Sequence, residues 1–218
     1  MSNVILVCTQ HGENGRCTSH ELCRILERIK PEVIFEEMPP SSFDEYYTER
    51  KRSNLETEAI SMYSESHDVK HIPVDYLDLP KGFFDDNRRM HKKVEEISAN
   101  YRRLIDSHSI YVRMYGFRYL NSDYCSNLFD DLDHSIRVAV QEIDDRSLTQ
   151  IHDSWNDVKR RRELEMINNI RTYIMEHEYD LGVFFIGAAH RRAIIQIVQN
   201  KNESRGIHWN FNNYDGYL

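Results

Sequence analysis

Two kinds of hydrophobic pattern alternate along the first third of the chain and return near its carboxyl end. Short apolar runs rich in β-branched residues predict buried strands, whereas apolar residues three and four positions apart predict helices that pack through one face. The predicted strands are residues 3–8, 33–35, 70–75, 182–186 and 206–211. The predicted helices beside them are residues 21–30, 54–64 and 192–199. Strands that alternate with helices predict an α/β fold, with a mostly parallel central sheet flanked by helices and right-handed crossovers.

Short local motifs help to define the ends of the first predicted helix and the strength of the third predicted strand. Thr18-Ser-His-Glu21 is the Thr-x-x-Glu signature of a capped helix start, and Pro31 discourages continuation of that helix past Lys30. Pro73 weakens the third strand, because proline has no N–H to donate to a sheet.

The strand pattern stops between residues 81 and 179, where charged segments with many aromatic residues follow a helical period. We expect a large helical insertion here, between the third strand and the strand that ends in Gly187-Ala-Ala-His190. Residues 87–107 predict one continuous helix, and residues 128–143 and 148–175 predict two more.

Length and charge limit the possible functions. A chain of 218 residues buries roughly 70% of its unfolded surface, enough for one core with a helical annex, and we predict a single domain over residues 1–218. The net charge of -8 and the pI of about 5.8 argue against a general nucleic-acid surface. The basic run Lys159-Arg-Arg-Arg162 is more typical of a solvated helix face, so no nucleic-acid partner is expected.

No stretch approaches the ~20 apolar residues that cross a bilayer, and the start lacks the pattern of a secretory signal. We therefore expect a cytoplasmic protein with no membrane contact, whose four cysteines stay as thiols. Cys17, His20 and Cys23 have a spacing that suggests zinc, but two-residue gaps spread these side chains around a helix start. The distant second pair of ligands is also missing, so buried or idle thiols are the preferred interpretation.

Ionisable residues stand at or just past the carboxyl ends of four predicted strands. In open α/β sheets this edge is where ligands bind, because loops and helix amino ends meet there. Two imidazoles with carboxylates form a good ligand set for Zn, Mn, Fe or Co. The residues are His11, Glu36, Glu37, Asp75 and His190.

Each of these residues also has a purely structural interpretation. His11 and Asp75 are typical turn formers after a strand, and Glu36 and Glu37 alternate across their strand, so that at most one faces a shared site. The small residues of Gly187-Ala-Ala suit a backbone that approaches a ligand, but they equally suit close packing of a helix on the strand.

Three short motifs end at these strand ends, and a fourth lies in the predicted helix 148–175. They are Cys8-Thr-Gln-His11, Pro31-Glu-Val-Ile-Phe-Glu-Glu37 and Gly187-Ala-Ala-His190, with Arg162-Glu163-x-x-Met166 in the helix. Together they resemble the TraB/Tiki family, within the wider erythromycin-esterase and ChaN-like group, whose marks are two Gly-x-x-His motifs and an acidic strand end. The resemblance places the family's histidines on His11 and His190, its glutamate on Glu37 and its helical arginine on Arg162. Cys8 departs from the glycine of the first family motif.

The resemblance implies a metal-dependent hydrolase, peptidase-like or esterase-like, that acts on a peptide or small molecule. His11, Glu37 and His190 would hold one divalent ion (Mn, Co, Fe or Zn), which activates water at neutral pH. Glu36 or Asp75 would orient a ligand or relay a proton, and Arg162 would bind a substrate carboxylate or an oxyanion.

Three alternatives stay open at this point. Glu13 is a further candidate base, although its Gly12-Glu-Asn-Gly15 context is also typical of a polar turn. A metal-free hydrolase would use a histidine as its base, with a carboxylate to orient it. A non-catalytic member of the same fold would bind haem, iron or another ligand, or act as a sensor.

Overall fold

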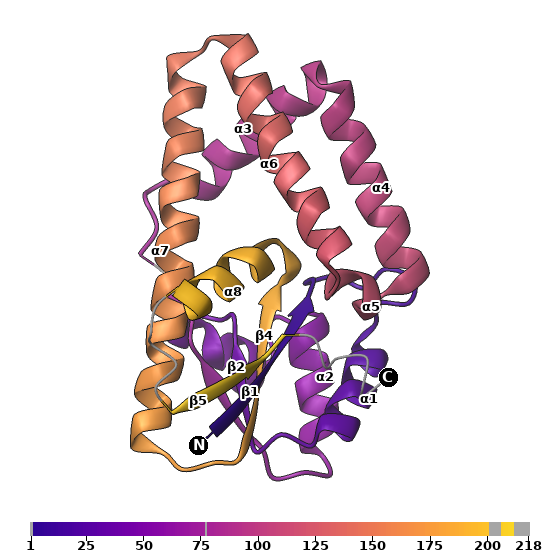
Figure 1. Ribbon diagram of the computed structural model, residues 1–218, viewed down its shortest axis with the longest axis vertical. Helices are drawn as coiled ribbons and strands as arrows, with labels where there is room; N and C mark the ends of the chain where they lie inside the picture. Colours follow the sequence, from indigo (N-terminus) through magenta and orange to yellow (C-terminus); the bar gives the residue numbers. More distant parts are fainter. Residues whose placement is uncertain (1, 77, 201–205, 212–218) are drawn as a thin grey trace.

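The computed structural model describes residues 2–76, 78–200 and 206–211, and within these ranges the strands form one sheet in which all neighbours are parallel (Figure 1). This confirms the predicted α/β class. The strands are β1 (Ser2–Thr9), β2 (Val33–Glu36), β3 (Lys70–Pro73), β4 (Leu181–Gly187) and β5 (Ile207–Asn210). Pro73 ends an edge strand, where its missing N–H costs no ladder hydrogen bond.

The order of the strands is β3-β2-β4-β1-β5, so β4 lies between β1 and β2. In this register Thr9 of β1 is opposite Gly187 of β4, and Glu36 of β2 is opposite Phe185 of β4. The carboxyl ends of β1, β2 and β4 therefore meet at one edge of the sheet, as the sequence predicts for the residues that follow these strands.

Helices cover both sides of the sheet. On one side, α1 (Ser19–Ile29) packs against α2 (Leu55–Ser64), and on the other side α8 (Arg191–Asn200) packs against the long helix α7 (Figure 1). Thr18 caps α1 by accepting a hydrogen bond from the backbone N–H of Glu21, as the Thr-x-x-Glu signature predicts. The short helical segments are η1 (Pro40–Ser42), η2 (Asp44–Thr48) and η3 (Ala188–His190).

The predicted helical insertion stands over the carboxyl edge of the sheet, toward which the strands point (Figure 1). Its helices run at angles to one another beyond the carboxyl ends of β1 and β4. They are α3 (Phe83–Ile97), α4 (Ala99–Tyr115), α5 (Phe117–Leu120), α6 (Asp123–Ile143) and α7 (Arg146–Glu176).

The prediction of one continuous helix over residues 87–107 is wrong, because the helix breaks at Ser98. The backbone of Ser98 is extended, and its side chain caps α4 by accepting a hydrogen bond from the N–H of Tyr101 at 3.1 Å. Ser98 Oγ also lies 3.1 Å from Ser135 Oγ on α6. The apolar period continues across this break, which is why the hydrophobic pattern alone does not reveal it.

The described residues form a main core around the sheet and smaller clusters within the helical insertion. Leu6, Phe35 and Phe184 are fully or almost fully buried in the main core. The larger cluster of the insertion, here called the insertion core, is separate from it and consists of Met90, Val94, Ile136, Ala139, Val140 and Leu148.

All four cysteines are free thiols, as predicted. Burial raises the pKa of Cys17 and of Cys125 to about 12, so these thiols stay protonated and unreactive near neutral pH. None of the helices in the described ranges is long and apolar enough to cross a membrane.

Candidate functional site

The strands β1 and β4 send their chains to opposite sides of the sheet. After β1 the chain leads to α1, which packs with α2, and after β4 it leads to α8 on the other side. Neighbouring strands that diverge in this way open a crevice at their carboxyl ends, which is the usual ligand site of α/β sheets. His11 follows β1 and His190 follows β4, so both histidines flank this crevice.

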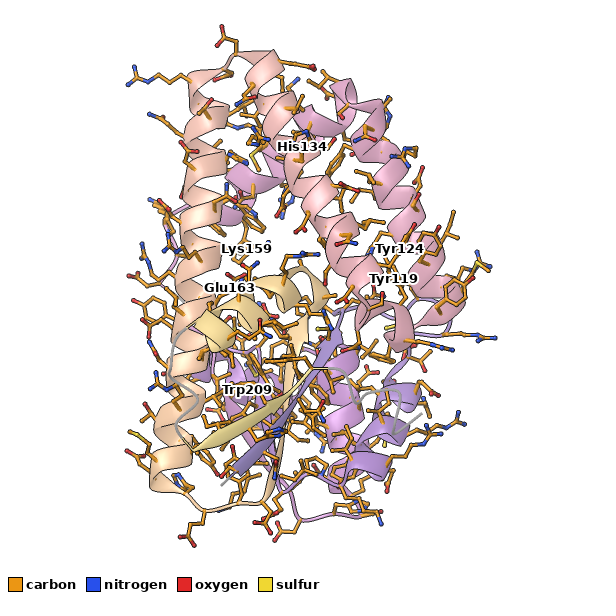
Figure 2. The ribbon with its side chains drawn as sticks, viewed as in Figure 1. Tyr119, Tyr124, His134, Lys159, Glu163 and Trp209 are labelled. Atoms are coloured by element: carbon orange, nitrogen blue, oxygen red, sulfur yellow. The ribbon has the colours of Figure 1, made fainter. Side chains whose placement is uncertain are left out.

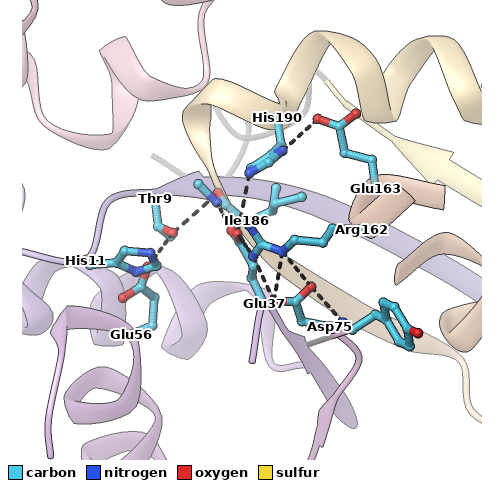
Figure 3. Close-up of polar contacts among 11 residues, drawn as sticks. Thr9, His11, Glu37, Glu56, Asp75, Arg162, Glu163, Ile186 and His190 are labelled. Carbon is cyan, nitrogen blue, oxygen red and sulfur yellow. Dashed lines mark hydrogen bonds and ion pairs between the residues drawn. The ribbon is translucent and has the colours of Figure 1, made fainter. Parts of the chain in front are cut away.

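Glu37 lies at the centre of the polar side chains in the crevice (Figure 3). One carboxylate oxygen accepts a 2.7 Å hydrogen bond from the backbone N–H of Gly187. The other oxygen lies 2.8 Å from Arg162 Nη2 and 3.5 Å from His190 Nε2. Burial alone would raise the pKa of Glu37, but the charges of His190 and Arg162 and the Gly187 N–H outweigh it and lower the pKa, so Glu37 is ionised.

Arg162 joins Glu37 to Asp75. Its Nε and Nη2 atoms donate to the two oxygens of Asp75 at 3.0 and 2.7 Å, and the Asp75 side chain is 3% exposed. Burial alone would lower the pKa of Arg162, but hydrogen bonds and charges from Asp75 and Glu37 raise it. The guanidinium is therefore a fixed cation that is already shared by two carboxylates.

His190 is held by a carboxylate from the helical insertion. Its Nδ1 lies 2.6 Å from the Oε1 atom of Glu163, and both side chains are buried. Because an ionised carboxylate only accepts hydrogen bonds, Nδ1 carries the proton in this pair, and Nε2 is the atom that His190 presents to the crevice. This is the arrangement of an oriented general base or of an oriented metal ligand.

His11 pairs with Glu56 at the start of α2. Its Nδ1 lies 3.4 Å from Glu56 Oε1, which also accepts a 2.7 Å hydrogen bond from Thr9 Oγ1. The hydrogen bond with Glu56 is the main cause that raises the pKa of His11 to about 9, against the opposing effect of burial. Since the His11 side chain is 67% exposed, solvent screens this pair and it adds little to stability.

Glu36 has different hydrogen-bond partners from Glu37, although both residues line one small cavity. Tyr47 donates a short hydrogen bond to one of its oxygens, and His71 Nδ1 lies 3.0 Å from the other. The Glu36 side chain is 4% exposed. Glu36 therefore belongs to a neighbouring pair with His71 and not to the Glu37–Arg162 network.

The structure does not bring Glu13 into the crevice. One Glu13 oxygen accepts hydrogen bonds from the backbone N–H and the hydroxyl of Ser19, each at 2.7 Å, and so ties down the first turn of α1. These bonds lower the pKa of Glu13. A role of Glu13 as a base stays a prediction, while the structure shows one of its oxygens holding the start of α1.

A small cavity of about 20 Å³ lies between the strand ends and α2, lined by His11, Glu36, Glu37 and Glu56, among others. Glu56 lines this cavity, and its Oε2 atom is buried without a hydrogen-bond partner among the described residues. A space of this size holds about one water molecule or ion. An unpaired buried carboxylate oxygen is costly, so the structure calls for a proton, a water or a cation at this point.

The charges of the crevice do not balance. Five carboxylates face it or border it, against one guanidinium and three imidazoles; even with every imidazole protonated, negative charge remains in excess. We call this set the carboxylate cluster; it consists of Glu36, Glu37, Glu56, Asp75, Glu163, Arg162, His11, His71 and His190. Within the ranges that the structure covers, no three histidine, cysteine or acidic side chains stand in a geometry that already forms a metal site.

Sequence reasoning missed the roles of Glu56 and Glu163. Glu163 lies within the motif Arg162-Glu163-x-x-Met166, and its position one residue after Arg162 is the available signal. Glu56 lies in the first turn of α2, which Asn54 caps by accepting a 2.8 Å hydrogen bond from the N–H of Thr57. The N–H of Leu55 donates to the carbonyl of His11, which fixes α2 beside the first histidine. No pattern in the sequence predicts that Glu56 and His11, which are distant in sequence, come into contact.

Comparisons of the chain with protein-family models, with curated proteins and with solved structures find no match.

Proposed function

We propose that this protein is a metal-dependent hydrolase whose ion is held by His11, Glu37 and Glu56. The observation that carries the proposal is the unpaired, buried oxygen of Glu56, a residue that lines the 20 Å³ cavity together with His11 and Glu37. Imidazole and carboxylates suit Mn, Co, Fe or Zn, and the excess negative charge of the carboxylate cluster favours a cation. We also propose kinship with the TraB/Tiki family, which rests on the short motifs alone.

A divalent ion in this position would supply a Lewis acid and lower the pKa of bound water toward ~7. Glu163 holds His190 so that Nε2 faces the crevice, and we assign His190 the role of general base and acid. This differs from the role expected from the sequence, in which His190 is a metal ligand, and it follows from the 2.6 Å contact with Glu163.

Arg162 and Asp75 position Glu37. Since the guanidinium is engaged by both carboxylates, it fixes the Glu37 carboxylate between the two histidines. We therefore assign Arg162 a positioning role in place of direct binding to a substrate carboxylate. Substrates of the proposed reaction are peptides or small esters, and the four free thiols support a reducing, cytoplasmic location.

Elemental analysis of the protein, purified without a histidine tag, tests the metal. We expect about one Mn, Co, Fe or Zn per chain, and a loss of about tenfold or more in affinity in Glu56→Gln. Glu58→Gln is the matched control, because Glu58 is exposed on the same helix and acidic like Glu56. A protein that binds none of these metals, or a Glu56→Gln variant that keeps its metal, contradicts the proposal.

A second candidate is a metal-free hydrolase, and the Glu163–His190 pair specifically favours it. A buried histidine oriented by a carboxylate is the base of many hydrolases that use no metal. Hydrolysis of a panel of peptides and small esters with and without chelator separates the two candidates. Activity that survives chelation but falls about 100-fold or more in both His190→Gln and Glu163→Gln supports the metal-free reaction.

A further inference from the structure

A second cavity lies between the helical insertion and the edge of the sheet. It has a volume of about 180 Å³ and reaches from helices α3, α4 and α6 down to His190 and Arg162. It is separate from the 20 Å³ cavity, which opens on the His11 side of Glu37. The helical insertion, which carries no readable motif, therefore provides most of the walls of a space that ends at the proposed base.

Aromatic rings line one wall of this cavity. Phe83 and Trp155 are stacked, with ring centroids 5.5 Å apart and an interplanar angle of 13°, and the His91 ring meets Trp155 edge-on at 6.0 Å. His91 Nδ1 lies 3.1 Å from the hydroxyl of Tyr101. Burial lowers the pKa of His91, so this ring is neutral near pH 7 and the wall carries no charge.

Aliphatic side chains line another part of the cavity. Leu132, Ile136 and Val158 are 4%, 7% and 5% exposed, and Ile105 stands at the opening with 41% exposure. A wall of this kind has no donors or acceptors to satisfy a polar group, so burying a charge here is costly. The occupant of this part is therefore apolar.

Polar side chains lie at the end of the cavity nearest the sheet. Lys159 and Glu163 are one turn apart on α7, which places them on the same side of the helix (Figure 2). Lys159 Nζ lies 3.6 Å from Asp133 Oδ2, and both residues line the cavity together with His190 and Arg162. A carbonyl or similar acceptor at this end would meet the Lys159 ammonium beside His190.

We propose that the 180 Å³ cavity is the subsite for an uncharged, ring-sized apolar group of the substrate, whose carbonyl end lies against Lys159 and His190. An apolar cavity of about 150 Å³ in another protein binds benzene, so the volume of this one fits a single ring. This names the substrate class of the proposed hydrolase and rests on that function, namely small esters or amides of aromatic or ring-like aliphatic acids.

Binding of benzamide tests the subsite without any turnover. Trp155 lines the cavity, and in the Trp209→Phe background it is the one tryptophan of the chain. We expect benzamide to change Trp155 fluorescence saturably with a Kd of about 1 mM, a usual affinity for so small a ligand. Acetamide, which lacks the ring, should leave the fluorescence unchanged at the same concentration.

Two variants of α4 provide the matched comparison. Ile105→Phe narrows the opening and should weaken benzamide binding about tenfold, while Ile110→Phe, on the same helix and 54% exposed, should leave it unchanged. Leu132→Ala enlarges the space and should improve binding of 2-naphthamide about tenfold over the wild type. Circular dichroism confirms the fold of each variant, and Leu132→Ala decides the case if Ile105→Phe does not fold.

The outcomes separate the subsite from the hydrolase. Benzamide binding with the expected variant pattern supports the subsite even if no ester or amide is hydrolysed, a result that would count against the proposed function alone. Absence of benzamide binding, or equal binding in Ile105→Phe and Ile110→Phe, overturns the subsite even if hydrolysis is found. Hydrolysis of acetyl and benzoyl esters at equal kcat/KM also overturns it.

Discussion

Arg162 is the cation that stabilises the buried carboxylates of Glu37 and Asp75 in the crevice. It comes from the middle of α7, yet its guanidinium reaches Glu37 after β2 and Asp75 after β3, and so it ties the helical insertion to the sheet. The neighbouring Arg160 and Arg161 are exposed. Within the basic run Lys159–Arg162, Arg160 and Arg161 are on the solvated helix face expected from the sequence, whereas Arg162 is in the crevice.

Replacing Arg162 by methionine keeps an unbranched apolar stem but removes the guanidinium, with its charge and its hydrogen-bond donors. We expect Arg162→Met to lower the free energy of unfolding by about 3–5 kcal/mol, because Glu37 and Asp75 are then buried without their cation. Urea unfolding at pH 7 measures this. The exposed control Arg161→Met should change stability by less than about 0.5 kcal/mol, and an equally small effect of Arg162→Met would show that the network does not stabilise the fold.

The site is partly predictable at this level. His11, Glu37, Asp75 and His190 are identifiable because each follows a strand, and the edge of a parallel sheet brings such residues together. Glu56 and Glu163 act from helices, and their partners, His11 and His190, are distant in sequence. Only tertiary packing decides which of the many acidic residues on helices meets which histidine, so neither contact follows from spacing.

His108 makes stability depend on pH in a known direction. It lies beside Phe129 and 3.0 Å from the hydroxyl of Tyr119, and burial lowers its pKa from the usual 6.5. The folded state therefore disfavours the charged ring. The stability that this contributes is fully present above pH 6.5 and is lost as the pH falls below 6.5 toward the lower pKa of the folded state.

We expect His108→Gln to reduce the loss of stability between pH 7 and pH 5. Urea unfolding at both pH values measures the difference between the variant and the wild type. Ser109→Ala, an exposed change on the same helix, should keep the wild-type difference. An unchanged difference in His108→Gln would mean that its burial does not control acid sensitivity.

Helices and strands are the features that the hydrophobic pattern predicts best. All five strands and the helices of the sheet region appear within a few residues of their predicted positions, because each buries a face with a regular period. The break between α3 and α4 escapes prediction, since a serine that caps a helix leaves no mark on that period. A serine side chain can make several alternative local hydrogen bonds, and only one of them caps a helix. At Ser98 the contact with Ser135 on α6 favours the capping hydrogen bond to Tyr101.

Removal of this cap tests its role. We expect Ser98→Ala to lower the free energy of unfolding by about 1 kcal/mol, because the N–H of Tyr101 loses its acceptor. Thermal and urea unfolding measure the change. Ser61→Ala, at an exposed position within α2, is the control and should be neutral. An equal effect of both changes would argue that α3 and α4 do not depend on the cap.

The molecule as a whole has a sheet core and a separate insertion core. Met90, which is fully buried, packs in the insertion core with Val94 and Ile136. Because this cluster is separate from the main core, we expect its stability to be partly independent of the sheet. We therefore expect that the helices of the insertion core can open while β1 and β4 stay paired, which bears on access to the 180 Å³ cavity.

Met90→Ala is expected to destabilise the insertion core by about 2–5 kcal/mol. Hydrogen exchange should then accelerate in α3 and in the adjacent parts of α6 and α7, with β1 and β4 still protected. Met175→Ala is the control, because Met175 is 81% exposed on α7. Uniform acceleration through the sheet would instead show that the whole chain unfolds as one cooperative unit.

The position of β4 between β1 and β2 affects how the nascent chain folds during synthesis. β1 pairs with β4 and β5, and the hydroxyl of Thr9 meets a carbonyl 177 positions further on. While the ribosome is still translating the helical insertion, β1 has no partner strand, because β4 and β5 have not yet been synthesised. The apolar β1 therefore stays unpaired until β4 leaves the ribosome. During this delay we expect nascent chains to bind chaperones or to aggregate.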